Sequence, residues 1–161
     1  MTCDSEPGKG TRFELYFPAM KTEPQPEDIP EKPAAPSGTE TILLVDDEEF
    51  VRDLGKRILS RAGYKVLTAG NGREALDIYR KELGKISLVV LDIVMPVMGG
   101  RQCIPELSKV DPRVKILVST GYSSEDDERE QAASILPLGF IRKPFAVSSL
   151  LQAVRETIDK E

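Results

Sequence analysis

The sequence predicts an α/β fold with a five-stranded parallel sheet and helices on both faces. Short runs of consecutive apolar residues recur along the second part of the chain, as expected of strands buried on both sides. Stretches with apolar residues at helical spacing separate these runs. Because strand and helix alternate, the strands should be parallel, and right-handed crossovers then place helices on both faces.

The first two strand–helix pairs have clear boundaries. Residues 42–45 are continuously apolar and predict a buried strand. A helix over about 48–62 follows, with its apolar residues on one side, and Gly63 stops it. Residues 64–68 are again typical of a strand, and Asn71-Gly72 leads into the second helix.

The last three pairs complete the alternation. Strands are predicted at 88–91, 114–118 and 140–141, and helices at about 99–109, 125–135 and 147–158. The helix over 125–135 has the weakest apolar pattern of the three.

The first 40 residues differ in character. Phe13, Leu15 and Phe17 alternate with polar residues, which predicts one half-buried strand without a sheet of its own. The stretch after it is rich in proline and glutamate, which is typical of an extended linker. The chain is therefore expected to divide into residues 1–20, 21–40 and 41–161.

Composition excludes several classes of function. The net charge of -5 argues against non-specific nucleic-acid binding. The absence of histidine excludes histidine-dependent acid–base chemistry and histidine-ligated zinc within these residues. The two cysteines form no CxxC pair, no apolar run is long enough to span a bilayer, and the first residues lack the apolar segment of a signal peptide. A reduced, cytoplasmic setting is expected.

Polar side chains follow four of the predicted strands. They are Asp46 and Asp47 after the first strand, Asp92 after the third, Thr120 at the end of the fourth, and Lys143 after the fifth. Ligands of open parallel sheets bind beyond the carboxyl ends of the strands. We therefore expect these groups to converge at one edge of the sheet.

Such a cluster has a definite chemistry. Carboxylates held about 4–6 Å apart repel one another unless a cation is present, and Mg²⁺ prefers hard oxygen ligands. Lys143 can contact a phosphate as a point charge, and Thr120 offers a hydroxyl donor. A carboxylate in these surroundings can accept a phosphoryl group and form an aspartyl phosphate.

Taken singly, each of these residues has a structural explanation. The Asp46-Asp47 pair could begin a loop or cap a helix, and Asp92 could belong to a turn. Lys143 could be an exposed lysine before a proline that starts a helix. The four groups on the expected strands, in the expected order, favour a functional site.

The residues at these strand ends resemble the response-regulator receiver family over residues 41–161. The matching motifs are Leu44-Val45-Asp46-Asp47, Leu91-Asp92-Ile93-Val94-Met95-Pro96, Ser119-Thr120-Gly121-Tyr122 and Arg142-Lys143-Pro144-Phe145. The resemblance implies a flavodoxin-like, doubly wound (βα)5 fold. It also implies a role in two-component or phosphorelay signal transduction.

The resemblance assigns roles by position. It implies that Asp92 is the phosphoacceptor and that Lys143 contacts the phosphoryl group. Thr120 would be the switch hydroxyl and Phe140 the switch aromatic residue. The ligands implied for Mg²⁺ are Asp46, Asp47, Asp92 and the backbone carbonyl of Val94.

Two departures from the family pattern bear on the site. Gly99 stands where the family has an aspartate, which removes a helix cap without touching the chemistry. Val94 and Tyr122 flank the expected path of an attacking water, and neither readily orients it. We therefore expect a fairly long-lived aspartyl phosphate.

A second resemblance concerns the N-terminus. Residues 5–13 resemble the last glycine-rich turn and strand of a histidine-kinase ATP-binding domain, within a first segment that spans residues 1–20. The chain would then be the C-terminal piece of a hybrid sensor kinase. Its expected partners are the kinase domain of its own parent and a histidine phosphotransfer protein, with neither nucleic acid nor membrane involved.

Two other functions remain open from the sequence. One is an Mg²⁺-dependent phosphohydrolase resembling the haloacid-dehalogenase type, which needs a second aspartate where Val94 stands. The other is a pseudo-receiver interaction module, which would be expected to lack one of the site residues. A DNA-binding output domain is not expected in this chain, because only enough sequence for one helix follows Lys143.

Overall fold

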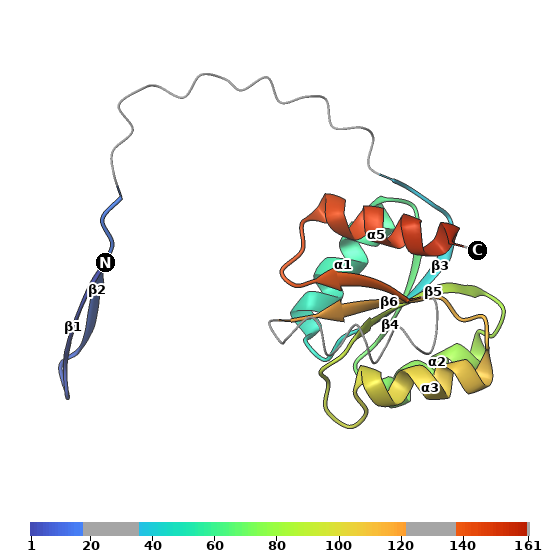
Figure 1. The fold of residues 1–161 in the computed structure, drawn as a ribbon, viewed down its shortest axis with the longest axis horizontal. Coiled ribbons are helices and arrows are strands. Elements are labelled where there is room, and N and C mark those ends of the chain that lie inside the picture. Colours follow the sequence, from blue (N-terminus) through green and yellow to red (C-terminus); the bar gives the residue numbers. More distant parts are fainter. Residues whose placement is uncertain (18–35, 122–137, 161) are drawn as a thin grey trace, which may run out of the picture. The chain divides into compact units, whose positions relative to one another are not determined.

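The computed structural model describes residues 1–17, 36–121 and 138–160, in two units that divide after Pro33 (Figure 1). The second unit contains a five-stranded sheet in the order β4-β3-β5-β6-β7. Every neighbouring pair in it is parallel. Its strands are β3 (Thr41–Val45), β4 (Lys65–Ala69), β5 (Ile86–Asp92), β6 (Ile116–Thr120) and β7 (Leu138–Arg142). The predicted parallel sheet is confirmed.

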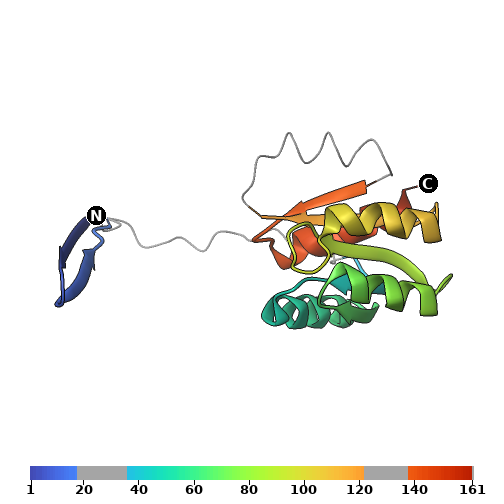
Figure 2. The ribbon, with the colours of Figure 1, turned by 90° about the horizontal axis from the view of Figure 1, so that it is seen from below.

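Helices cover both faces of this sheet. They are α1 (Glu49–Arg61), α2 (Gly72–Lys81), α3 (Gly100–Val110) and α5 (Val147–Asp159). Helices α1 and α5 lie on one face and α2 and α3 on the other, as Figure 1 shows, and Figure 2 gives the view from below Figure 1, toward α2 and α3. The helix predicted over 125–135 lies outside the described residues. No helix within the described ranges is both long and apolar enough to cross a membrane.

The alternation of side chains along the strands divides the core into two layers. In β3, Leu43 and Val45 pack with α2 and α3, whereas Ile42 and Leu44 pack with α1 and α5. The same alternation continues through β5 and β6, all of whose apolar residues are buried. Continuously apolar strands were therefore a correct sign of a sheet buried on both faces.

Local signals set the helix boundaries. Asn71 caps α2, since its side chain accepts a hydrogen bond of 3.0 Å from the backbone N–H of Glu74. Gly63 follows the end of α1 with φ of 98°, a conformation that favours glycine. At Gly72, a Cβ atom would lie 2.8 Å from the carbonyl oxygen of Met98, so this glycine allows α2 to begin directly against the loop before α3.

The N-terminal unit corrects one prediction. Instead of a single strand, it forms an antiparallel hairpin of β1 (Thr2–Glu6) and β2 (Gly10–Glu14). The expectation of half-burial is also wrong, because the side chain of Phe13 is 60% exposed. The first strand was missed because the sequence Thr-Cys-Asp-Ser-Glu has no apolar alternation.

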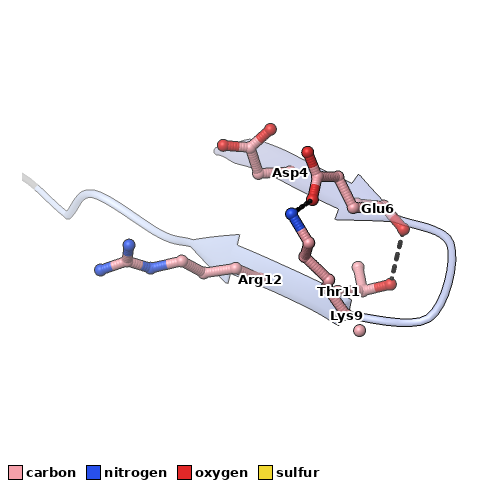
Figure 3. A pocket seen from close by; sticks show the side chains of 7 residues that line it. Asp4, Glu6, Lys9, Thr11 and Arg12 are labelled. Atoms are coloured by element: carbon pink, nitrogen blue, oxygen red, sulfur yellow. Dashed lines mark hydrogen bonds and ion pairs between the residues drawn. The ribbon is translucent and has the colours of Figure 1, made fainter.

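The turn of this hairpin is held by polar contacts. The Lys9 ammonium lies 2.6 Å from a carboxylate oxygen of Glu6. Figure 3 marks this ion pair with a dashed line. The hydroxyls of Ser5 and Thr11 are hydrogen-bonded across the strands at 2.9 Å. Gly8 has φ of 80°, which suits the tight turn between the strands. A two-stranded hairpin alone has marginal stability, and these contacts are all exposed.

The two cysteines should differ sharply in reactivity. Cys3 is exposed on β1, whereas Cys103 is buried on α3. Burial, with a smaller effect of the Glu106 charge, raises the pKa of the Cys103 thiol to about 12. We expect a thiol reagent at neutral pH to label Cys3 in the native protein and Cys103 only after unfolding. The Cys3→Ser variant, followed by absorbance, should stay unlabelled until denaturant is added; rapid native labelling of that variant would contradict the burial of Cys103.

Candidate functional site

The site lies at the carboxyl edge of the sheet, where the predicted residues converge. Asp46 and Asp47 follow β3, Asp92 is the last residue of β5, and Lys143 follows β7. The Asp46 and Asp92 side chains are buried, with 2% and 7% of their residue surfaces exposed, whereas Asp47 is exposed. Their placement follows from the parallel topology, which brings the ends of all five strands to one edge.

Lys143 joins the two buried carboxylates. Its Nζ lies 2.5 Å from Oδ2 of Asp46 and 2.8 Å from Oδ2 of Asp92. One carboxylate oxygen from each of Asp46, Asp47 and Asp92 can be chosen so that all three lie within 4.8 Å of one another. Three acids and one base therefore occupy a space of a few ångströms, as the sequence predicts.

The electrostatics of the site reflect this crowding. Burial raises the pKa of Asp92, and the negative charge of Asp46 raises it further. Lys143 acts in the opposite direction but does not cancel the effect of burial. For Lys143 itself, burial favours the neutral amine, but the hydrogen bonds to Asp46 and Asp92 outweigh it and raise the pKa of the ammonium. Lys143 is therefore charged at neutral pH.

Backbone contacts fix the loop that carries the acidic pair. Oδ1 of Asp46 accepts a hydrogen bond of 3.0 Å from the N–H of Glu48. The Arg52 guanidinium donates to the carbonyl oxygens of Asp46, at 2.6 Å, and of Asp47, at 2.8 Å. Arg52 was missed by sequence reasoning, because an arginine near the start of an amphipathic helix looks like any exposed helical charge.

The loop after β5 lies close to the Asp92 carboxylate. Oδ1 of Asp92 accepts a long hydrogen bond of 3.4 Å from the N–H of Val94, whose side chain is 71% exposed. A Cβ at Gly100 would lie 2.5 Å from the Asp92 carbonyl oxygen, so α3 begins in direct contact with the end of β5. As expected, Gly99 occupies the N-cap position of α3 without a side-chain cap.

Thr120 and Phe140 lie on the other face of the sheet from Asp92. Phe140 pairs with Val118 in register and packs against the core beside α2 and α3. Thr120, two residues after Val118, belongs to the same face of β6. It contributes its carbonyl oxygen to the site, accepting from the N–H of Lys143 at 2.8 Å. Tyr122 lies outside the described residues.

The donor set suits a hard divalent cation. The side-chain atoms that could bind a metal ion in the cluster are all carboxylate oxygens, and hard cations such as Mg²⁺ bind through oxygen. Asp47, the exposed member, leaves the cluster accessible from solvent. An ionised carboxylate beside an ammonium and such a cation is equipped for nucleophilic attack on an anionic phosphoryl group, because the positive charges offset the repulsion.

Comparison with known proteins identifies relatives of this chain. The family model described as the response regulator receiver domain matches residues 42–155. The sensor kinase CckA of Brucella abortus is 38% identical over 99% of this chain, which spans 18% of the length of that kinase. The chemotaxis protein CheY of Thermotoga maritima is 40% identical over 71% of this chain and 94% of its own.

A solved structure extends the likeness to the fold. The response regulator protein TrrA of Thermotoga maritima, in complex with Mg²⁺ and beryllium fluoride, superposes with a TM-score of 0.64 and 31% sequence identity. The match covers 73% of this chain and 98% of that one. The match therefore spans nearly the whole of a solved response regulator.

Asp92→Asn should stabilise the protein at neutral pH when no divalent cation is present. A carboxyl whose pKa is raised by folding stabilises the native state while protonated, and that stability is lost as pH rises through the raised pKa. At pH 7 the ionised Asp92 therefore opposes folding, and the variant should melt a few degrees higher. The gain should disappear below about pH 4, where the carboxyl is protonated in both states.

The measurement is a set of melting curves from about pH 3.5 to 8, a range that spans the ordinary titration of a carboxyl group, in the presence of a chelator. Asp77→Asn is the matched control, because Asp77 is an exposed carboxylate on α2 that pairs with Arg80, outside the site. A lower melting temperature for Asp92→Asn than for the wild type at pH 7 would contradict the conclusion that the ionised Asp92 carboxylate opposes folding.

Proposed function

This chain belongs to the response regulator receiver domain family, whose members accept phosphoryl groups in two-component signalling, and we propose that Asp92 is the accepting residue. The observation that carries the proposal is the contact of Lys143 with both Asp46 and Asp92. It sets a nucleophilic carboxylate beside a fixed positive charge at the ligand-binding edge of the sheet.

The proposed reaction is a transfer from phosphohistidine. An Asp92 carboxylate oxygen attacks the phosphorus, the P–N bond breaks, and its electron pair goes to the imidazole of the donor. No general base is required, because the nucleophile is already ionised. Lys143 offsets the negative charge that accumulates on the phosphoryl oxygens. The hydrogen bond from the Lys143 ammonium to Asp46 keeps this ammonium close to Asp92.

We also propose that the acidic cluster holds Mg²⁺. Asp46, Asp47 and Asp92 would supply carboxylate oxygens, and Val94 would supply its backbone carbonyl. The bound ion would neutralise phosphoryl oxygens and lower the repulsion between the two anions. The complex of the Thermotoga maritima regulator with Mg²⁺ and beryllium fluoride supports this assignment by likeness.

The proposed response to phosphorylation involves Thr120 and Phe140. Thr120 stands at the end of β6, and its hydroxyl would move toward the phosphoryl group as a donor. Phe140, on the same face of the neighbouring strand and only partly buried, would fill the space so vacated. Val94 has no polar side-chain atom to orient an attacking water, which supports a long-lived acyl phosphate.

We propose that the chain derives from a hybrid sensor kinase. Residues 1–20 would be the end of the ATP-binding domain, 21–40 the linker and 41–161 the receiver. The match to the sensor kinase of Brucella abortus supports this origin, because it covers 99% of the chain and so includes the residues before the receiver. The phosphoryl donor would be the parent's own kinase domain, acting in the cytoplasm, with a histidine phosphotransfer protein as the next acceptor.

The phosphohydrolase alternative finds no support at the position that would decide it. Its acid–base aspartate would stand two residues after Asp92, where this chain has Val94 with an exposed apolar side chain. The pseudo-receiver alternative is disfavoured because Asp46, Asp47, Asp92 and Lys143 are all present at one edge of the sheet.

Acetyl phosphate with Mg²⁺ should phosphorylate the chain at Asp92. Intact-mass spectrometry should show the gain of one phosphoryl group by the wild type and none by Asp92→Asn, which lacks the nucleophile. Asp53→Asn is the matched control, since Asp53 is exposed on α1, and it should be labelled like the wild type. Equal labelling of Asp92→Asn and the wild type would refute the proposal.

Replacement of Asp47 should weaken Mg²⁺ binding without unfolding the protein. Asp47 is exposed, so Asp47→Asn should keep the native melting temperature in a chelator. Loss of one ligand should raise the Kd for Mg²⁺ about tenfold or more. Titration calorimetry measures this, with Glu49→Gln in the first turn of α1 as the control. Unchanged affinity in Asp47→Asn would remove Asp47 from the metal site.

A further inference from the structure

The Ser119 hydroxyl is a buried polar group without a hydrogen-bond partner among the described residues. Ser119 lies in β6 and is 3% exposed, and its Oγ makes no hydrogen bond there. A hydroxyl that is buried in this way loses its bonds to water and gains nothing in return. A buried polar group without a partner in a native protein therefore needs an explanation. One explanation is that its partner is present only in a functional state, such as a modified or ligand-bound form.

The sheet register places Ser119 beside the phosphoacceptor. Asp92 and Ser119 are direct partners in the pairing of β5 with β6, so their side chains leave the sheet on the same face. This is the face covered by α1 and α5, because Val90 and Leu117, two residues earlier on each strand, pack in that layer. Thr120, the next residue, belongs to the opposite face.

The Lys143 side chain passes over the same position. Strand β6 lies between β5 and β7, so Lys143, which follows β7, must reach across the end of β6 to contact Asp92. Ser119 is paired with Ile141, two residues before Lys143. Ser119 therefore lies on β6, between β5 with Asp92 and β7, after which Lys143 follows. Its side chain is on the same face of the sheet as that of Asp92.

Phosphorylation of Asp92 would change the hydrogen bonds that its two carboxylate oxygens accept. In the unmodified protein, Lys143 donates to Oδ2 of Asp92. In the acyl phosphate, one carboxylate oxygen is bonded to phosphorus and the other is a carbonyl oxygen. The dianionic phosphoryl group is the stronger attraction for the Lys143 ammonium. The carbonyl oxygen then loses the Lys143 donor. The proposed Mg²⁺ would occupy one of its two lone pairs, which leaves the other lone pair open to a hydrogen-bond donor.

We propose that Ser119 donates a hydrogen bond to the acyl carbonyl oxygen of phosphorylated Asp92, an inference that rests on the function proposed above. The neutral hydroxyl suits a neutral carbonyl, and the sheet register places Ser119 directly opposite Asp92 on the neighbouring strand, with both side chains on the same face. Ser119 is thus a second hydroxyl of the site, with a role different from that of Thr120.

This hydrogen bond would shorten the life of the acyl phosphate. In hydrolysis, a water oxygen attacks the phosphorus, the P–O bond to Asp92 breaks, and its electron pair returns to the carboxylate. Both protons of the water leave with the inorganic phosphate, which is released as dihydrogen phosphate. Negative charge spreads over both oxygens of the departing carboxylate, so a donor at the second oxygen stabilises the transition state more than the acyl phosphate.

Removal of the hydroxyl should therefore slow dephosphorylation. We expect Ser119→Ala, labelled with acetyl phosphate and Mg²⁺ and then freed of the donor, to lose phosphate about fivefold more slowly than the wild type, as one hydrogen bond of ordinary net strength would give. Ser119→Thr keeps the hydroxyl and should restore the wild-type rate. Ser108→Ala, on α3, is a matched control that should leave the rate unchanged.

A second measurement separates this role from a structural one. Because Ser119 has no partner among the described residues of the unmodified protein, Ser119→Ala should melt at the wild-type temperature or higher. An unchanged or faster loss of phosphate from a folded Ser119→Ala variant would overturn the inference while leaving Asp92 as the acceptor. If the wild type takes up no phosphate on Asp92, the proposed function itself fails.

Discussion

The Lys143 ammonium is the interaction on which the site depends. Two buried carboxylates at the end of a sheet would repel each other and lose their hydration, and either effect alone would favour their protonation. Lys143 contacts both of them, from a strand that is neighbour to neither. Lys143 therefore lowers the pKa of the buried Asp92 carboxylate, the proposed nucleophile, although burial still keeps that pKa raised.

The rest of the fold serves to hold these groups at the right separation. The order of the strands puts β3 and β5 side by side, so that Asp46 and Asp92 meet. Arg52 and the N–H of Glu48 fix the loop after β3, and the close start of α3 fixes the end of β5. These contacts involve the backbone, which explains how the acids can be crowded without the loops moving apart.

The sequence was sufficient for the sheet and for the charged residues of the site, because both follow from simple patterns. Continuous apolar runs give parallel strands, and their carboxyl ends meet, so Asp46, Asp92 and Lys143 could be placed from the sequence alone. The hairpin strand β1 could not, since its side chains are polar and exposed and leave no pattern. Arg52 was also missed, and Ser119 was placed at the end of its strand but given no role. The contacts of Arg52 and the proposed role of Ser119 depend on which backbone carbonyl or which residue of a neighbouring strand the side chain meets, and the apolar pattern of the sequence does not specify this.

The residues proposed to act in the site are distributed over the two faces of the sheet. Asp92 and Ser119 lie on the face covered by α1 and α5, whereas Thr120 and Phe140 lie on the face covered by α2 and α3. Covalent chemistry and its proposed read-out are thus separated by a single thickness of backbone. Because the Thr120 hydroxyl would have to reach the phosphoryl group from the face that carries Phe140, the end of β6 is the place where the two layers would be coupled.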